Sequence, residues 1–514
     1  MRAARHLPAL LAAALPLTFL PISVDAYVLP RTSLLLLFAG AGAALLTWKG
    51  PRSLGTLRWP AATVAVAALV ACATSITPAL SVAGAYSRYE DAPVRLAYVA
   101  SFWSAACLLR TDGDRRRLVS FYVVASCIVA LEAVWQAWPG NFSGRPDGNL
   151  GQPGLLGAVL AMAVPPAVDR GTRAGRRKWL LAIPVLLAGL AVSLSRSGWL
   201  GAAIGSAVVL AARLAAARRL SRPVVGAVPA VAAAIAFAVL LLTPLRALNQ
   251  DTGSARLHLW ADTAGAIAAR PLTGWGEDTF GLVIGRFLHG DWEPGVTFDR
   301  AHSQPLDLLM AQGVLGLAAV TAFWAVYAAG IWKHRRSPEV APLAAGWLAG
   351  LVWSLLNFDG APATGMQWLL AGAAWSAVSD SRQGRASPRV PVAAPVAIAI
   401  AAAAVLLALP PLAADIAYYK GELRTAVTLD PLQARYRQAV GEDELARGDR
   451  AAAARDLRMA EALGSSDARV YVETGDILKS ERDTVGARAQ YARALELYPF
   501  DRDARSRYSS SSSK

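Results

Sequence analysis

Apolar segments follow one another along most of the chain, from about residue 7 to about residue 413. A helix needs about 20 mainly apolar residues to cross a hydrocarbon core about 30 Å thick. By that measure the pattern predicts thirteen membrane-spanning helices, which begin near residues 7, 32, 59, 94, 118, 154, 179, 198, 223, 305, 340, 364 and 390. The chain is therefore predicted to be an all-α polytopic membrane protein with 12–13 transmembrane helices.

Basic residues in the connecting loops predict which side of the membrane each loop faces. Alternate loops up to residue 389 hold 24 Lys and Arg in one set and nine in the other. Short cytoplasmic loops carry the excess of positive charge. The amino terminus is therefore predicted to be cytoplasmic, and the sparsely charged loops, including a long one at residues 244–304, are predicted to lie outside.

Net charge and cysteine content exclude two other classes of protein. The net charge of +15 is confined to the membrane part, because residues 415–514 hold seventeen basic and seventeen acidic side chains. The excess is explained by the inner loops, so binding to nucleic acid is not expected. All three cysteines fall within predicted spans, which predicts neither a disulfide framework nor a zinc site.

The first apolar segment allows two interpretations. HLPALLAAALPLTFLPISVDA has the basic start, apolar centre and small-residue end of a cleavable signal peptide, and it also suits a first span. Its removal would leave the orientation of every later span unchanged.

A helical tail with an internal period follows the last span. Alanine recurs every 34 positions at Ala426, Ala460 and Ala494, and leucine does so at Leu429, Leu463 and Leu497. This pattern resembles the tetratricopeptide repeat, in which paired helices bury small residues against each other. The sequence thus predicts a membrane domain at 1–413, a tail at 414–508 that leans on it or on additional degenerate helices, and disorder at 509–514. The tail either recruits a protein partner or caps the outer face.

One arginine stands between two apolar segments, in SLSRSGWLG at residues 193–201. A charged side chain at bilayer depth costs about 2.5–3.5 kcal/mol on insertion scales. Ser195, Ser197 and Gly198 suit a tight turn between two spans, which predicts that Arg196 lies at the outer end of both. The long outer loop contains RLHLWADTAGAIAARP, which predicts a short amphipathic helix that ends at Pro271.

Several further arginines and one histidine share the predicted outer face: Arg88, Arg145, Arg256, Arg300 and His302. Arginine binds phosphate in a bidentate manner and never loses its proton, and histidine accepts protons near neutral pH. Each residue also has an ordinary interpretation. Arg88 and Arg145 have acidic neighbours, Arg256 could pair with Asp251 or Asp262, and a single histidine near a membrane surface is often structural.

The order of these motifs resembles the O-antigen ligase and polymerase superfamily of bacterial glycosyltransferases. SLSRSGWLG, ARLHLW, RPLTGWGEDTFG and AHSQPLDLLMAQGVLG occur in that order around one long outer loop, and GAYSRYEDAP and GRPDGNLGQPG resemble the early loops of the family. The resemblance covers roughly residues 80–360.

The resemblance implies a function for the outer arginines and the histidine. Such proteins transfer a glycan from undecaprenyl diphosphate to an acceptor at the periplasmic face of the inner membrane, without a metal, other cofactor or nucleotide sugar. Arg196 and Arg256 match the arginines that hold the diphosphate, and His302 matches the histidine that activates the acceptor. Arg88, Arg145 and Arg300 are expected to bind substrate.

Two positions depart from the family pattern. Ser303 follows the histidine where the family usually has asparagine, and Gly154 stands where GNPN of the family has its second asparagine. These departures affect the expected contacts with the acceptor more than those with the diphosphate. The acceptor therefore stays open among a lipid, a glycan and a protein.

Other functions explain fewer of these features. A flippase or transporter of lipid-linked glycans would bind the carrier without consuming it. An intramembrane serine protease would use Ser197 and a distant histidine, but Ser195 replaces the glycine of the rhomboid motif and the arginines would have no role. An oligosaccharyltransferase would need a long first outer loop, and a metal enzyme would need closer ligand spacing.

Overall fold

The computed structural model describes residues 3–50, 54–173, 177–216, 254–290, 292, 297–380 and 394–511. Its regular structure is helical, and no strand occurs in these ranges. Six of the described helices are long and apolar enough to cross a membrane. The predicted all-α polytopic architecture is confirmed.

Helices occupy twelve of the thirteen predicted positions, and the remaining one, near residue 223, lies outside the described residues. They are α1 (Leu7–Leu17), α2 (Val28–Lys49), α3 (Arg58–Ala73), α5 (Ala92–Leu108), α6 (Asp112–Gln136), α7 (Pro153–Gly171), α8 (Ala182–Val192), α9 (Arg196–Ala216), α13 (Gln304–Lys333), α14 (Ala341–Ser354), α15 (Met366–Asp380) and α16 (Ala394–Tyr419). The last of these continues past the domain boundary predicted at residue 413.

Shorter helices lie between the spans and in the tail. They are α4 (Pro78–Ala83), α11 (Ser254–Ala269), α12 (Phe280–Val283), the 3-10 helix η5 (Ile284–Phe287), α17 (Leu423–Leu429), α18 (Ala434–Ala446), α19 (Arg450–Ala462), α20 (Ala468–Ser480), α21 (Thr484–Leu497) and α22 (Arg502–Ser510). The helix predicted before Pro271 is confirmed as α11. Helix α22 includes two residues of the segment expected to be disordered.

Small residues allow the spans to pack closely, as is usual for helices in membranes. Gly40 of α2 faces Ala404 of α16 so closely that a Cβ atom at Gly40 would lie 2.2 Å from that of Ala404. In the same way, a Cβ atom at Gly201 of α9 would lie 2.5 Å from the carbonyl oxygen of Ala349 in α14. Backbone proximity of this kind explains the frequency of Gly and Ala in the apolar segments.

A kink in α13 receives the glycine-rich turn of the long outer loop. Gly313 leaves helical geometry, with φ 63° and ψ −163°. The backbone N–H groups of Trp275 and Gly276 donate to the carbonyls of Met310 and Ala311 over 2.7 and 3.0 Å. A Cβ atom at Gly313 would lie 2.3 Å from the carbonyl oxygen of Leu272, so only glycine fits. The motifs RPLTGWGEDTFG and AQGVLG therefore form one structural unit.

The tail consists of helices packed in succession, with α18 against α19 and α20 against α21. The three alanines of the 34-residue period, Ala426, Ala460 and Ala494, are all completely buried. The period therefore marks equivalent buried positions on α17, α19 and α21. Whether these units are tetratricopeptide repeats stays a prediction.

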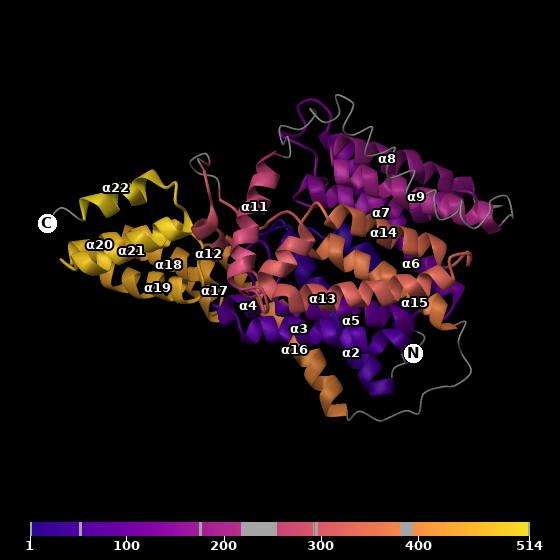
Figure 1. Ribbon diagram of the computed structural model, residues 1–514, viewed down its shortest axis with the longest axis horizontal. Helices are drawn as coiled ribbons and strands as arrows, with labels where there is room; N and C mark the ends of the chain where they lie inside the picture. Colours follow the sequence, from indigo (N-terminus) through magenta and orange to yellow (C-terminus); the bar gives the residue numbers. More distant parts are fainter. Residues whose placement is uncertain are drawn as a thin grey trace.

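The tail and the outer loop share one hydrophobic core, which we call the loop–tail core. Its buried members include residues of α11, α12 and η5 of the loop and of α19, α20 and α21 of the tail. Arg286 pairs with Glu496 over 3.0 Å at its edge. Figure 1 shows the tail at one end of the bundle, beside α12. The expectation that the tail leans on the membrane domain agrees with this contact.

Replacing Gly285 tests whether the loop–tail core holds the tail in place. A Cβ atom there would lie 2.3 Å from the carbonyl oxygen of Leu497. Because crowding of a packed interface costs about 1–3 kcal/mol, we expect Gly285→Ala to lower the melting temperature and to make α21 more accessible to protease. The control is Gly265→Ala, since a Cβ atom there meets only Phe287 at an ordinary 3.5 Å. Equal protease resistance of the two variants would contradict the role of this contact.

Candidate functional site

Arg196 begins α9, directly after a three-residue connection from α8. Leu194 has a left-handed backbone, with φ 51°, and the Ser195 hydroxyl accepts from the N–H of Gly198 over 3.3 Å. These features form the tight turn predicted from the sequence. Arg196 is half-buried at the end of the two helices. Its charge therefore lies near the end of the spans and not at their centre.

The segment between α14 and α15, Leu356–Asp359, contacts three of the predicted site residues and the neighbour of a fourth. Arg256 Nη1 donates to the carbonyl of Leu356 over 2.9 Å. The side-chain amide of Asn357 donates to the hydroxyl of Ser197 over 2.8 Å. Consecutive residues of one segment thus hold α11 and the first turn of α9, and they bring Arg256 and Arg196 to the same end of the bundle.

Phe358, the next residue of this segment, lies between two further predicted site residues. The ring of His302 meets it edge to face, with 5.3 Å between centroids. The guanidinium carbon of Arg88 lies 4.9 Å from the centroid of the same ring, within the range of a cation–π contact. His302 and Arg88 are therefore neighbours, although 214 positions separate them in the chain.

Arg145 approaches the site from the loop after α6. Its Nη2 donates to the carbonyl of Ser193 over 2.7 Å, at the start of the turn that precedes Arg196. In the same part of the structure, Gln152 of GQPG caps α7 by accepting from the N–H of Leu155 over 3.1 Å. The early loop therefore reaches the α8–α9 turn through Arg145.

Arg300 lies deeper than the other arginines and is only 5% exposed. It donates to the carboxylate of Asp278 and, over 2.8 Å, to the carbonyl of Asp299. Asp299 in turn accepts from Arg88. Burial raises the pKa of Asp299, but Arg88 and Arg300 outweigh it and hold that pKa below its ordinary value. Arg300 thus fixes the segment that leads to His302, and its contact with substrate stays a prediction.

His302 itself has a left-handed backbone, with φ 55°, immediately before α13. Histidine adopts this conformation more often than most residues, but it is uncommon and occurs preferentially at functional sites. Ser303, the departure from the family pattern, is 6% exposed and forms the amino-terminal cap position of α13. The side chain after the histidine is therefore largely removed from solvent.

A buried ion cluster behind the site was missed by the sequence analysis. Arg95 forms an ion pair with Asp359 and lies 3.4 Å from carboxylate oxygens of Glu90 and of Glu277. Gln304, two residues after the histidine, donates to Asp359 over 2.6 Å. The cluster therefore connects the segment Leu356–Asp359 to α5, to the outer loop and to the start of α13. A signal was present, since Arg95 also stands in an apolar segment, as Arg196 does.

Burial and charge act in opposite directions on the two glutamates of this cluster. Burial raises the pKa of Glu90 and of Glu277, and the charge of Arg95 partly offsets that effect. Neutral carboxyl groups cost less to bury than charged ones. The carboxylates of the cluster face Arg95, so the cluster is a buried polar scaffold that holds Asp359 in place.

Groups of three or more His, Cys, Asp or Glu side chains suited to hold a metal ion do not occur among the described residues. The chemical groups gathered at Leu356–Asp359 are guanidinium, imidazole, amide and aromatic side chains, together with the carboxylate of Asp359, which pairs with Arg95. Guanidinium groups stabilise phosphate charge, and an imidazole accepts a proton. The arrangement suits the transfer of a group away from a phosphate.

Comparison with known proteins identifies part of the chain. Residues 181–321 match a protein-family model described as O-antigen ligase. The match includes Arg196, Arg256, Arg300 and His302, whereas Arg88, Arg145 and Leu356–Asp359 lie outside it. No curated protein matches the chain. The match at residues 181–321 supports the resemblance to the O-antigen ligase superfamily.

Proposed function

We propose that this protein transfers a glycan from undecaprenyl diphosphate to an acceptor at the periplasmic face of the bacterial inner membrane. The observation that carries the proposal is that Arg256, His302 and Ser197, the neighbour of Arg196, all contact Leu356–Asp359. The family match supports glycan transfer of the O-antigen ligase or polymerase type in general. The donor and the side of the membrane are inferred from the site and from the loop charges.

A mainly apolar cavity that begins at Trp199 and lies along α9 supports a lipid-linked donor. It has a volume of about 400 Å³ and is lined by Trp199, Ala202 and Ala203 of α9 together with apolar residues of α7 and α8. Trp199 lies one helical turn from Arg196. A polyprenyl chain in this cavity would place its diphosphate at the end of α9, where Arg196 begins the helix.

The proposed reaction is a direct displacement at the anomeric carbon of the donor glycan. The acceptor hydroxyl oxygen forms the new bond to this carbon as the bond to the diphosphate oxygen breaks. His302 takes the proton of the acceptor hydroxyl, and undecaprenyl diphosphate leaves with both electrons of the broken bond. Arg196 and Arg256 stabilise the charge that accumulates on the leaving diphosphate, which is a large contribution in such reactions.

The remaining predicted residues have supporting roles in this proposal. Arg88 and Arg145 lie close enough to the three central residues to contact the diphosphate or the first sugars of the glycan. Arg300 is proposed to act mainly through the segment that holds His302. The acceptor is a lipid, a glycan or a protein, and the tail offers a place for a protein partner on the same face as the site.

Substitution of the three central residues tests the assignment. We expect Arg196→Ala, Arg256→Ala and His302→Ala each to lower glycan transfer by about 10²-fold or more, because each removes charge stabilisation or proton transfer. The measurement is the release of undecaprenyl diphosphate from a labelled glycan donor by the purified protein in liposomes. Matched controls are Arg270→Ala, which loses contacts with the Thr74 carbonyl and the Trp275 ring, and His289→Ala, whose 81% exposed side chain loses a contact with Asp262.

The outcome also separates an enzyme from a flippase. Glycan movement across the liposome membrane without release of the diphosphate would support the flippase and contradict the proposal. Full transfer by the Arg196 and His302 variants would contradict the assigned roles, even if transfer itself is observed. Insertion of every variant is checked by its gel-filtration profile.

Asn357 gives a second test, since it has no charge and binds the site only through hydrogen bonds. Its amide donates to Ser197 and, over 2.9 Å, to the carbonyl of Trp353. Loss of a buried hydrogen bond costs about 1–3 kcal/mol, so Asn357→Ala is expected to reduce transfer by about tenfold or more. The control is Asn141→Ala, an exposed residue at the same end of the bundle. Equal rates for the two variants would show that Asn357 does not position Arg196.

A further inference from the structure

A cluster of arginines surrounds two adjoining cavities at the end of the bundle that lies away from the candidate site. The first is small, about 30 Å³, and lies among α6, α7 and α14. The second, about 440 Å³, lies among α7, α9 and the α13–α14 connection. Their lining includes Arg115, Arg116, Arg170, Arg173, Arg213 and Arg336, against the two carboxylates Asp169 and Glu339.

The distance between this cluster and the candidate site can be estimated along helix α9, because both contribute an arginine to it. Arg196 and Arg213 are 17 residues apart on this helix, which corresponds to about 26 Å at a rise of 1.5 Å per residue. That is close to the thickness of a hydrocarbon core, about 30 Å. The cluster therefore lies at the opposite membrane boundary from Arg196.

Tryptophans at the same end give independent evidence for the level of the lipid headgroups. Trp48, Trp59 and Trp332 are each more than half exposed, and each has a basic side chain over its ring. Trp179 has the guanidinium carbon of Arg170 at 4.6 Å from its ring centroid. Tryptophan is enriched where a membrane protein crosses the interface between hydrocarbon and water. The cavities therefore open at headgroup depth.

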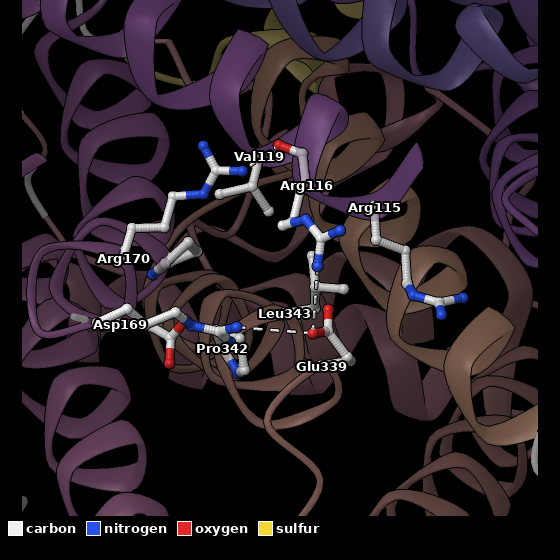
Figure 2. Close-up of a pocket in the computed structure, with 10 residues that line it drawn as sticks. Arg115, Arg116, Val119, Asp169, Arg170, Glu339, Pro342 and Leu343 are labelled. Atoms are coloured by element: carbon white, nitrogen blue, oxygen red, sulfur yellow. Dashed lines mark hydrogen bonds and ion pairs between the residues drawn. The ribbon is translucent and has the colours of Figure 1, made fainter. Parts of the chain in front are cut away.

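The carboxylates of the cluster neutralise only part of its charge. Asp169 is buried and binds Arg173 and Arg213 over 2.9 and 2.8 Å. Glu339 lies 3.6 Å from Arg173 and 3.8 Å from Arg116. Figure 2 shows Arg170, Arg116 and Arg115 following one another along one side of the first cavity, with Asp169 and Glu339 on the other. Arg115 also pairs with Asp112. Among the described residues, six arginines thus face three carboxylates, so positive charge remains in excess.

The lining of the larger cavity combines three kinds of side chain. Arg173, Arg213 and Arg336 provide guanidinium groups, and Thr172 and Ser337 provide hydroxyl groups. Apolar residues form the rest of the wall: Val209, Ala212, Pro338 and Ala341. Guanidinium and hydroxyl groups bind phosphate oxygens, and apolar walls accept acyl chains. A free phosphate ion would use only the polar part.

We propose that this arginine-lined cavity binds the headgroup phosphate of an anionic phospholipid. Basic pockets between transmembrane helices are a known way to bind such headgroups. The site is separate from the candidate transfer site and does not depend on its function. Bound lipid would join α7, α9 and the start of α14, which are the helices that also carry Arg196 and lead to Leu356–Asp359.

The test compares two double variants of the full chain. Arg116→Gln with Arg336→Gln removes two arginines that line the cavities without taking away the ion pairs of buried Asp169. Arg116 has a side chain 43% exposed, and Arg336 is exposed. The matched control is Lys49→Gln with Arg58→Gln, which removes two exposed charges at the same end but outside the cavities. Gel filtration verifies that both variants are folded.

Binding is measured with phosphatidylglycerol and with phosphatidylcholine of the same acyl chains, titrated into the detergent-solubilised protein and counted by native mass spectrometry. We expect the unsubstituted chain and the control to prefer phosphatidylglycerol, and the cavity variant to bind it about tenfold or more weakly, because each basic residue near a headgroup contributes substantially. Inorganic phosphate at the same concentration should not displace the lipid.

Three outcomes would overturn the proposal. Equal phosphatidylglycerol affinity of the cavity variant and the control would show that the arginines only help to orient the protein in the membrane. Equal affinity of the unsubstituted chain for the two lipids would exclude an anionic headgroup site. Displacement of the lipid by an equal concentration of inorganic phosphate would show that the cavity binds free phosphate.

Discussion

The ion pair between Arg95 and Asp359 joins the amino-terminal half of the bundle to the segment on which the candidate site is assembled. A guanidinium buried at the start of α5 is stable only when carboxylates surround it, and removal of one partner from such a pair costs several kcal/mol. The cluster around Arg95 therefore fixes the position of Leu356–Asp359. Arg256 and His302 contact that segment. The ion pair between Arg95 and Asp359 therefore helps to set their distance from Arg196, although neither residue takes part in it.

The spans were predictable because apolar length is a local property of the sequence, and the α8–α9 turn was predictable because serine and glycine flank Arg196. The family match at residues 181–321 agrees with the order of motifs that singled out Arg256 and His302. Leu356–Asp359 was not predictable in the same way. Its four residues resemble the end of an ordinary span, and their partners in the site lie between 55 and 270 positions away in the chain. Only the folded structure shows that these contacts meet.

The kink at Gly313 explains why two motifs of the outer loop are separated by a helix start and still act as one unit. Main-chain hydrogen bonds attach residues 275 and 276 to the carbonyl groups that the kink exposes in α13. Unsatisfied backbone groups are expensive in an apolar surrounding. The turn before Glu277 and the helix after His302 therefore stabilise each other. The glycines of RPLTGWGEDTFG and AQGVLG allow the two backbones to approach closely enough for these hydrogen bonds.

The loop–tail core also sets an order of events during synthesis. Phe280 and Ile284 pack against α21, whose last residue, Leu497, is made more than two hundred residues later. At a synthesis rate of about 5–20 residues per second, α21 is completed roughly ten to forty seconds after the loop beside His302. A chain still on the ribosome therefore carries the spans and the arginines without a finished outer surface. The outer surface beside the loop is complete only after α21 has been synthesised.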